Sequence, residues 1–289
     1  MQLLCALRTC SGVRVLTPDL RLECHGDDQQ GDKARPHDTI MTDLRQERGR
    51  TRRLYGSPGR SNYTEQVSWL STFNRFRPGR VPLVGPVALF VADWSRPQRG
   101  EAPMFDSPLL ERLSVVRPLY PTAVYLPAGL FLLWRSATGL AGPLTSAGLY
   151  LAGLLAWSLL EYGAHRGSFH HEPQNQRQLA VAYLIHGVHH AYPDDSRRWM
   201  LPLAVTIPVT SLLYLGFRAA LGVHADASFA GFVHGYLSYD LVHYFIHRGR
   251  MPGRIGRFLR QHHMAHHYSK PERNFGVSSP LWDVVFRTR

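Results

Sequence analysis

Histidine is the residue whose number and spacing point to chemistry in this sequence. The chain holds 16 histidines among 289 residues, and fourteen of them fall between His165 and His267. They include four clusters: His165/His170, His186/His189/His190, His243/His247 and His262/His263/His266/His267. Imidazole suits iron, zinc and copper, whereas a structural zinc ion needs only four ligands and usually takes some cysteine. So many imidazoles therefore predict a redox-active pair of metal ions.

Helix geometry divides the clustered histidines into two sets. Three pairs are spaced four residues apart: His186/His190, His243/His247 and His263/His267. Residues at this spacing share a helix face, so each pair can share one metal. His189 and His266 point to another side of their helices and suit the neighbouring metal. We expect ten ligands in two centres: His165, His170, His186, His190 and His266 on one, and His189, His243, His247, His263 and His267 on the other.

Three further residues are candidates for the catalytic site. Glu161 precedes His165 by one helical turn, and Asp240 precedes His243 by three residues. Each carboxylate can accept the outer N–H of a ligand histidine and orient its ring, although Asp240 also suits a helix boundary. Tyr244 is expected to border the substrate channel.

Two histidine positions need a separate explanation. His165 and His170 are five apart, which is off-face on a regular helix, so we expect Gly167 to let the chain unwind there. His234 lies about two turns before His243 and is expected to satisfy a buried hydrogen bond rather than bind metal.

Four apolar stretches must position these residues, at about 119–134, 139–160, 199–217 and 227–246. A spanning helix needs roughly 20 apolar residues. The fourth stretch contains His234, Asp240 and His243, so it spans only if these face the protein interior. We therefore expect an all-α integral membrane protein with four transmembrane helices and a helical cap that holds the metal site.

Charge supports this topology. The formal net charge is +12, and arginine supplies nearly all the positive charge. The arginines lie beside apolar stretches, and no nucleic-acid-binding fold is visible, so a nucleic-acid partner is not expected. The positive-inside rule assigns the N-terminus, 161–198 and the tail from Arg248 to the cytosol. The histidine site would then face the cytosol at a bacterial inner membrane or the endoplasmic reticulum.

The first third of the chain has a different composition. Residues 1–103 are polar and rich in arginine, and we expect them to be largely disordered. The stretch 81–94 is apolar and would lie on the membrane surface or against a catalytic domain of residues 104–289. Cys5, Cys10 and Cys24 lack metal-ligand spacing and are expected to be unpaired thiols.

Combined, these motifs resemble the fatty acid hydroxylase superfamily, and within it the fatty acid 2-hydroxylases. The similar segments are EYGAHRGSFH at 161–170, HGVHHAYPDD at 186–195, GYLSYDLVHYFIH at 235–247 and LRQHHMAHH at 259–267. The ending FGVSSPLWDVVF at 275–286 and the segment FDSPLLERLS at 105–114 are similar too. The resemblance covers about residues 104–289.

The resemblance implies a helical membrane fold, two iron ions on the ten histidines above, O₂ as co-substrate and a long acyl substrate hydroxylated at carbon 2. Zinc often occupies such sites in isolated proteins. The His-Pro-Gly-Gly motif of a cytochrome b5 domain does not occur here. Two electrons would then come from a separate cytochrome b5-like protein, ferredoxin or reductase.

Two alternatives stay open at this stage. Within the superfamily they are sterol desaturation or methyl oxidation, and carotenoid hydroxylation. In another class of protein, the histidines would belong to a non-catalytic zinc-binding membrane protein. The acyl acceptor, whether free acid, ceramide or another lipid, is also open.

Overall fold

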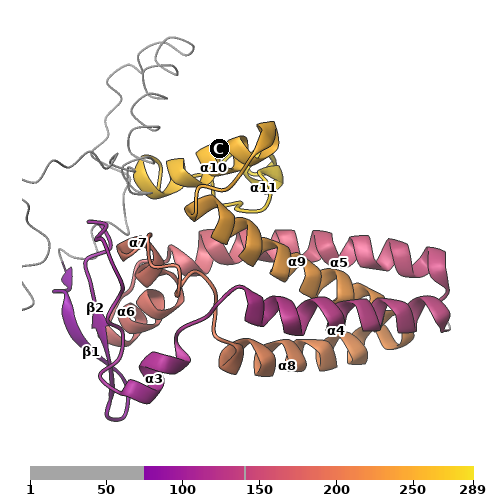
Figure 1. The fold of residues 1–289 in the computed structure, drawn as a ribbon, viewed down its shortest axis with the longest axis horizontal. Helices are drawn as coiled ribbons and strands as arrows, with labels where there is room; N and C mark the ends of the chain where they lie inside the picture. The colour runs from indigo at the N-terminus through magenta and orange to yellow at the C-terminus, as the bar shows by residue number, and fades with distance from the viewer. Residues whose placement is uncertain (1–74, 140) are drawn as a thin grey trace, which may run out of the picture. The chain divides into compact units, whose positions relative to one another are not determined.

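The computed structural model of the chain describes residues 75–139 and 141–289, most of which are helical. Four helices of 19 to 23 residues lie side by side (Figure 1): α4 Leu119–Thr138, α5 Pro143–Ala164, α8 Leu203–Leu221 and α9 Ala225–His247. Of the all-α class predicted from the sequence, the mainly helical architecture is confirmed. The disorder predicted for the N-terminal region concerns mostly residues 1–74, which lie outside the described part of the chain.

The outer faces of these helices are apolar. Leu144, Leu151 and Leu212 leave 88%, 63% and 69% of their surface exposed, while α9 is buried along most of its length. Judged by length and composition, two stretches can cross a membrane: Pro143–Phe169 and Leu203–His247. The second stretch contains both α8 and α9, joined by the short helix η4 Gly222–His224. Leucines that face outward are expected where the surrounding solvent is lipid rather than water.

Helices α5 and α9 make the closest contact in the bundle, and two glycines permit it. A Cβ atom on Gly231 would lie 1.9 Å from the carbonyl oxygen of Tyr150, and one on Gly153 would lie 2.0 Å from that of Ser228. Only glycine fits where two helix backbones approach this closely. The contact fixes the relative height of α5 and α9, and hence of the histidines at their C-terminal ends.

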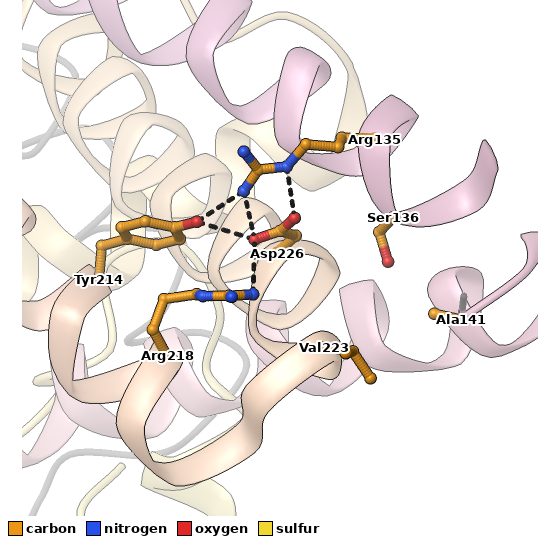
Figure 2. A pocket seen from close by; sticks show the side chains of 7 residues that line it. All are labelled: Arg135, Ser136, Ala141, Tyr214, Arg218, Val223 and Asp226. Carbon is orange, nitrogen blue, oxygen red and sulfur yellow. Dashed lines mark hydrogen bonds and ion pairs between the residues drawn. The ribbon is translucent and has the colours of Figure 1, made fainter. Parts of the chain in front are cut away.

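An ion-pair cluster closes the end of the bundle that lies away from these histidines (Figure 2). Arg135 donates from Nε to Asp226 Oδ2 at 2.6 Å and from Nη2 to Asp226 Oδ1 at 2.7 Å. Tyr214 donates to the same carboxylate at 2.8 Å, and Arg218 lies 3.8 Å from it, beside a pocket of about 380 Å³. Asp226 and His247 are the ends of one helix, about 30 Å apart at 1.5 Å per residue. The negative charge of the buried Asp226 carboxylate is thus balanced by arginine and by hydrogen bonds, as a buried charge requires.

The other end of the bundle carries a cap of short elements. They are α3 Pro108–Leu113, α6 Gln176–Ala182, α7 Val188–Ala191, α10 Gly253–Tyr268 and α11 Leu281–Val285. Two π-helical turns, η2 His165–Phe169 and η3 Tyr183–Gly187, continue α5 and α6.

The segment 81–94 departs from the predicted all-α class, because it forms a β-hairpin. Strand β1 Gly79–Val84 pairs antiparallel with β2 Val87–Val91 through a turn at Gly85, whose φ is +55°. Alternating apolar residues bury one face of the hairpin against α6 and η3. Trp94 stacks on Tyr183 at 5.8 Å and fills the space beside Gly187. Residues on both sides of position 103 therefore share one core, and that core supports the helix of His186.

Replacing Gly231 with Ala should destabilise the protein by about 1–3 kcal/mol, because its Cβ would overlap the α5 backbone. The matched control is Gly148→Ala on α5, where a Cβ meets no atom within 4 Å. Thermal unfolding in detergent would measure both variants. Equal melting temperatures for the two would contradict the close α5–α9 contact.

Candidate metal centre

Ten buried histidines gather at the cap end of the bundle. Group A consists of His165, His170, His186, His190 and His266, and group B consists of His189, His243, His247, His263 and His267. Within each group the five candidate ligand atoms lie within 4.8 Å of one another. The two groups have the same members as the two sets expected from helix geometry, and each pair at four-residue spacing stays within one group. That these residues bind metal remains a prediction.

A π-helical turn brings the first two histidines together. Residues 165–169 form η2, and the rings of His165 and His170 lie 5.0 Å apart. Because π-helical hydrogen bonds join residues five apart, this turn places such residues on one side. The helix therefore widens, and the unwinding expected at Gly167 does not occur. A second π turn, η3, contains His186 and leads directly into α7, which carries His190.

The nitrogen spacing in group A fits a shared ion. His186 Nε2 lies 3.1 Å from His165 Nε2 and 2.8 Å from His190 Nε2. Ligands about 2.1 Å from an ion and about 90° apart would be about 3.0 Å from each other. The spacing therefore suits a metal ion between the rings.

Group B has the same internal spacing. His189 Nε2 lies 3.0 Å from His243 Nε2 and 2.9 Å from His267 Nε2. His263 Nε2 lies 3.1 Å from both His247 Nε2 and His267 Nε2. All five rings thus turn the same nitrogen toward one point, which five unrelated core histidines would have no reason to do.

The two groups adjoin through α7. His189 belongs to group B and the next residue, His190, to group A. The rings of His190 and His267 stack at 4.3 Å across the boundary between the groups. Two ions held there would be neighbours in one site.

Hydrogen bonds set the tautomers of two group A histidines. His165 donates from Nδ1 to the carbonyl oxygen of Phe275 at 2.5 Å, and His266 donates from Nδ1 to that of Arg273 at 2.8 Å. A carbonyl only accepts, so each Nδ1 carries the proton and each Nε2 keeps a lone pair. The Nε2 of His266 is buried and has no hydrogen-bond partner among the described residues. A buried, unpaired acceptor of this kind fits a metal ligand.

Burial also favours the protonation state that metals need. It lowers the pKa values of His186, His189, His190, His263 and His267 well below the ordinary value, and the neighbouring imidazoles lower them further. The neutral imidazole is the form that coordinates metal. At neutral pH the site therefore offers uncharged nitrogen donors.

The predicted contacts between carboxylates and ligand histidines are wrong for Glu161. Its Oε1 accepts hydrogen bonds from the N–H groups of Val277 and Ser278 at 2.8 and 2.9 Å, and its Oε2 from the Ser278 hydroxyl at 2.5 Å. Asp240 is buried, yet no hydrogen bond to a histidine is found for it in the described ranges, and its Oδ2 has no partner there. In the described part of the chain, neither carboxylate therefore has a hydrogen bond to a histidine of group A or group B.

Tyr244 is half-buried and packs edge-on against Trp199 at 5.1 Å. Trp199 in turn lies 5.3 Å from the ring of His247, and its indole donates to the carbonyl oxygen of Pro193 at 3.0 Å. Tyr244 therefore reaches group B through Trp199, a residue that the sequence did not single out.

Other histidines lie outside the two groups. His234 contacts the Tyr150 hydroxyl at 3.0 Å and the Leu126 carbonyl oxygen at 3.1 Å, as expected for a buried hydrogen-bonded residue. His171 is exposed.

Asp283 is the functional candidate that sequence reasoning missed. Its carboxylate is fully buried and pairs with His262 Nε2 at 3.0 Å. Burial alone would raise its pKa, but hydrogen bonds from His262, Gly276, Thr288 and Phe275 outweigh burial and lower the pKa. The sequence signal for Asp283 is its place in the FGVSSPLWDVVF segment at 275–286, one of the segments that carry the family resemblance.

Comparison with known proteins places this site in a family. A family model described as fatty acid hydroxylase matches residues 150–288. A dihydroceramide fatty acyl 2-hydroxylase of Arabidopsis thaliana is 36% identical over 57% of this chain and 70% of its own length. The ceramide very long chain fatty acid hydroxylase SCS7 of Saccharomyces cerevisiae is 32% identical over 66% of this chain and 50% of its own. The human fatty acid 2-hydroxylase is 31% identical over 64% and 56%.

A solved structure is also similar. It is described as full-length scs7p with only the hydroxylase domain visible, and it matches with a TM-score of 0.63 at 32% identity, over 68% of this chain and 76% of that one. The matched part spans 50% of the yeast relative and 56% of the human one. The predicted oxidoreductase class is confirmed, and the chain belongs to the fatty acid hydroxylase family.

Proposed function

We propose that this chain is a membrane monooxygenase that hydroxylates a fatty acyl chain at carbon 2, using O₂ and two iron ions held by groups A and B. The observation that carries the proposal is the pair of adjoining groups of five buried histidines, in a chain whose relatives are named as fatty acyl 2-hydroxylases. The names of the relatives give two acyl acceptors to test, ceramide and free fatty acid.

The ten histidines suit the ions that this chemistry needs. Bound iron would supply O₂ activation for cleavage of an unactivated C–H bond, which side chains alone cannot perform. The chain itself contributes the uncharged nitrogen donors, holds them at fixed spacing and excludes water from their surroundings. The glutamate-rich ligand pattern of soluble di-iron bundles is replaced here by imidazole throughout.

Four membrane spans, α4, α5, α8 and α9, form part of the proposal. Their apolar outer faces support it. Segments 161–198 and 248–289, which carry most of the histidines and lie at the cap end, contain thirteen Arg and Lys residues, against Arg135 and Arg218 at the other end. By the positive-inside rule the cap would face the cytosol. A lipid acyl chain could then reach the site from the bilayer, and a separate electron donor could reach it from the cytosol.

Expression of the chain in a host that lacks 2-hydroxy fatty acids should produce them, as measured by lipid mass spectrometry. His189→Ala and His267→Ala should each reduce the product below detection, because each removes a group B nitrogen. His171→Ala, an exposed histidine outside both groups, is the matched control and should retain full product. Product that remains in either group B variant would contradict the ligand assignment, and the appearance of a modified sterol or carotenoid in place of 2-hydroxy fatty acids would favour another branch of the superfamily.

Purified protein should contain two metal ions per chain, measured by elemental analysis. Chelation should abolish the activity, and iron should restore it with concomitant O₂ consumption, because metal-free imidazoles have no redox chemistry. A preparation that binds zinc with full occupancy, yet never consumes O₂ after iron loading, would instead indicate a non-catalytic zinc protein.

A further inference from the structure

The segment 273–278, between α10 and α11, lies against group A. Its two carbonyl groups at Arg273 and Phe275 accept the Nδ1 protons of His266 and His165. These two ligands come from different helices, α10 and the end of α5, so one short segment orients rings from both.

The buried carboxylates of Asp283 and Glu161 hold the same segment through its N–H groups. Asp283 accepts from the N–H groups of Phe275 and Gly276 at 2.9 and 2.8 Å. Glu161 accepts from the next two N–H groups, of Val277 and Ser278. Four consecutive backbone donors are therefore bonded to two carboxylates, of which Asp283 is 0% and Glu161 5% exposed. Charge-assisted bonds of this kind are roughly twice as strong as neutral ones.

The carboxylates are themselves anchored to the elements that carry ligands. Glu161 lies one helical turn before His165 on α5, and Asp283 pairs with His262 on α10, next to His263. Asp283 also accepts from the Thr288 hydroxyl at 2.8 Å, while Asn274, in the left-handed region at φ +60°, donates its N–H to the Thr288 carbonyl. At Gly276 a Cβ would lie 2.2 Å from the Ser279 carbonyl oxygen, so the tight path of the segment requires glycine there.

Group B has no comparable support. The Nδ1 atoms of His189 and His263 are buried and lack hydrogen-bond partners within residues 75–139 and 141–289. Two of its five rings thus have no hydrogen bond that fixes them at Nδ1, whereas group A has two rings fixed by carbonyl groups that are themselves clamped.

We propose that residues 273–278, held by Glu161 and Asp283, form a clamp that acts on the group A centre alone, so that the two metals are held with unequal strength. Glu161 and Asp283 are positioning residues: they touch no ligand and act through the carbonyls of Phe275 and Arg273. The proposal rests on the ten-histidine metal function above. It assigns the group A ion as the tightly held one and the group B ion as the more readily exchanged one.

The first test uses the full-length wild-type protein in detergent with zinc as the probe, and follows metal release to a chelator. Release should occur in two steps of one ion each. His247→Ala, in group B, should remove the fast step, and His190→Ala, in group A, the slow one. A single step for both ions, or the opposite assignment, would overturn the inequality without affecting the proposed function, whereas a wild type that binds no metal would overturn both.

The second test removes the clamp. Asp283→Asn and Glu161→Gln keep an oxygen acceptor but lose the charge, and each should weaken the slow site by about 10- to 100-fold, the usual effect of removing a group that orients a metal ligand. Combining Glu161→Gln with His247→Ala should then leave no tightly bound zinc, while Glu161→Gln with His190→Ala should keep the fast site unchanged.

Asp195→Asn is the matched control, because Asp195 is also a buried carboxylate that accepts a backbone N–H, that of Ala102 at 2.9 Å, and it pairs with Arg198 rather than with the 273–278 segment. It should lower thermal stability and leave both release steps intact. If the Asp283 and Glu161 variants weaken both sites equally, or neither, while circular dichroism shows a native fold, the clamp is contradicted.

Discussion

The constraint on which the structure depends is the burial of ten imidazoles within reach of two points. Polar groups removed from water cost free energy unless they are paired, and here most Nε2 atoms face only each other. A metal ion shared among five nitrogens would resolve this cost, and burial keeps the rings in the neutral form that can bind it. Without a metal ion, burying these histidines would destabilise the fold relative to apolar side chains of similar size.

The helix bundle meets this constraint by controlling height and width. The glycine contact between α5 and α9 sets where the ends of these helices stand relative to each other. The π turns η2 and η3 then widen two helices at the points where histidines must turn inward. Helix α7 contributes neighbouring residues to both groups, which places the two centres side by side. Each device is local, but together they converge on one volume.

Segments from distant parts of the sequence support the histidine groups within the cap. The β1–β2 hairpin and Trp94 support the helix of His186 from one side, and the 273–278 segment supports His165 and His266 from another. At the far end of the bundle, Arg135 and Asp226 form a cluster that is independent of the histidines. The molecule thus separates a polar, ligand-bearing end from an ion-paired end by the length of its apolar helices.

The sequence by itself determined the membership of the two histidine groups and the family, because four-residue spacing is enough to place side chains on one helix face and because the motifs are specific in combination. It also determined the helical class and the apolar stretches. Only the tertiary structure decided what Glu161 and Asp283 do, since their partners are backbone groups 7 to 117 residues away that no periodicity encodes. The same holds for the π turn at His165 and for the hairpin at 79–91, whose strand form depends on burial against α6. Spacing within a helix depends only on neighbouring residues. The hydrogen bonds that orient a ring come from residues that are distant in the sequence and that only the tertiary fold brings close.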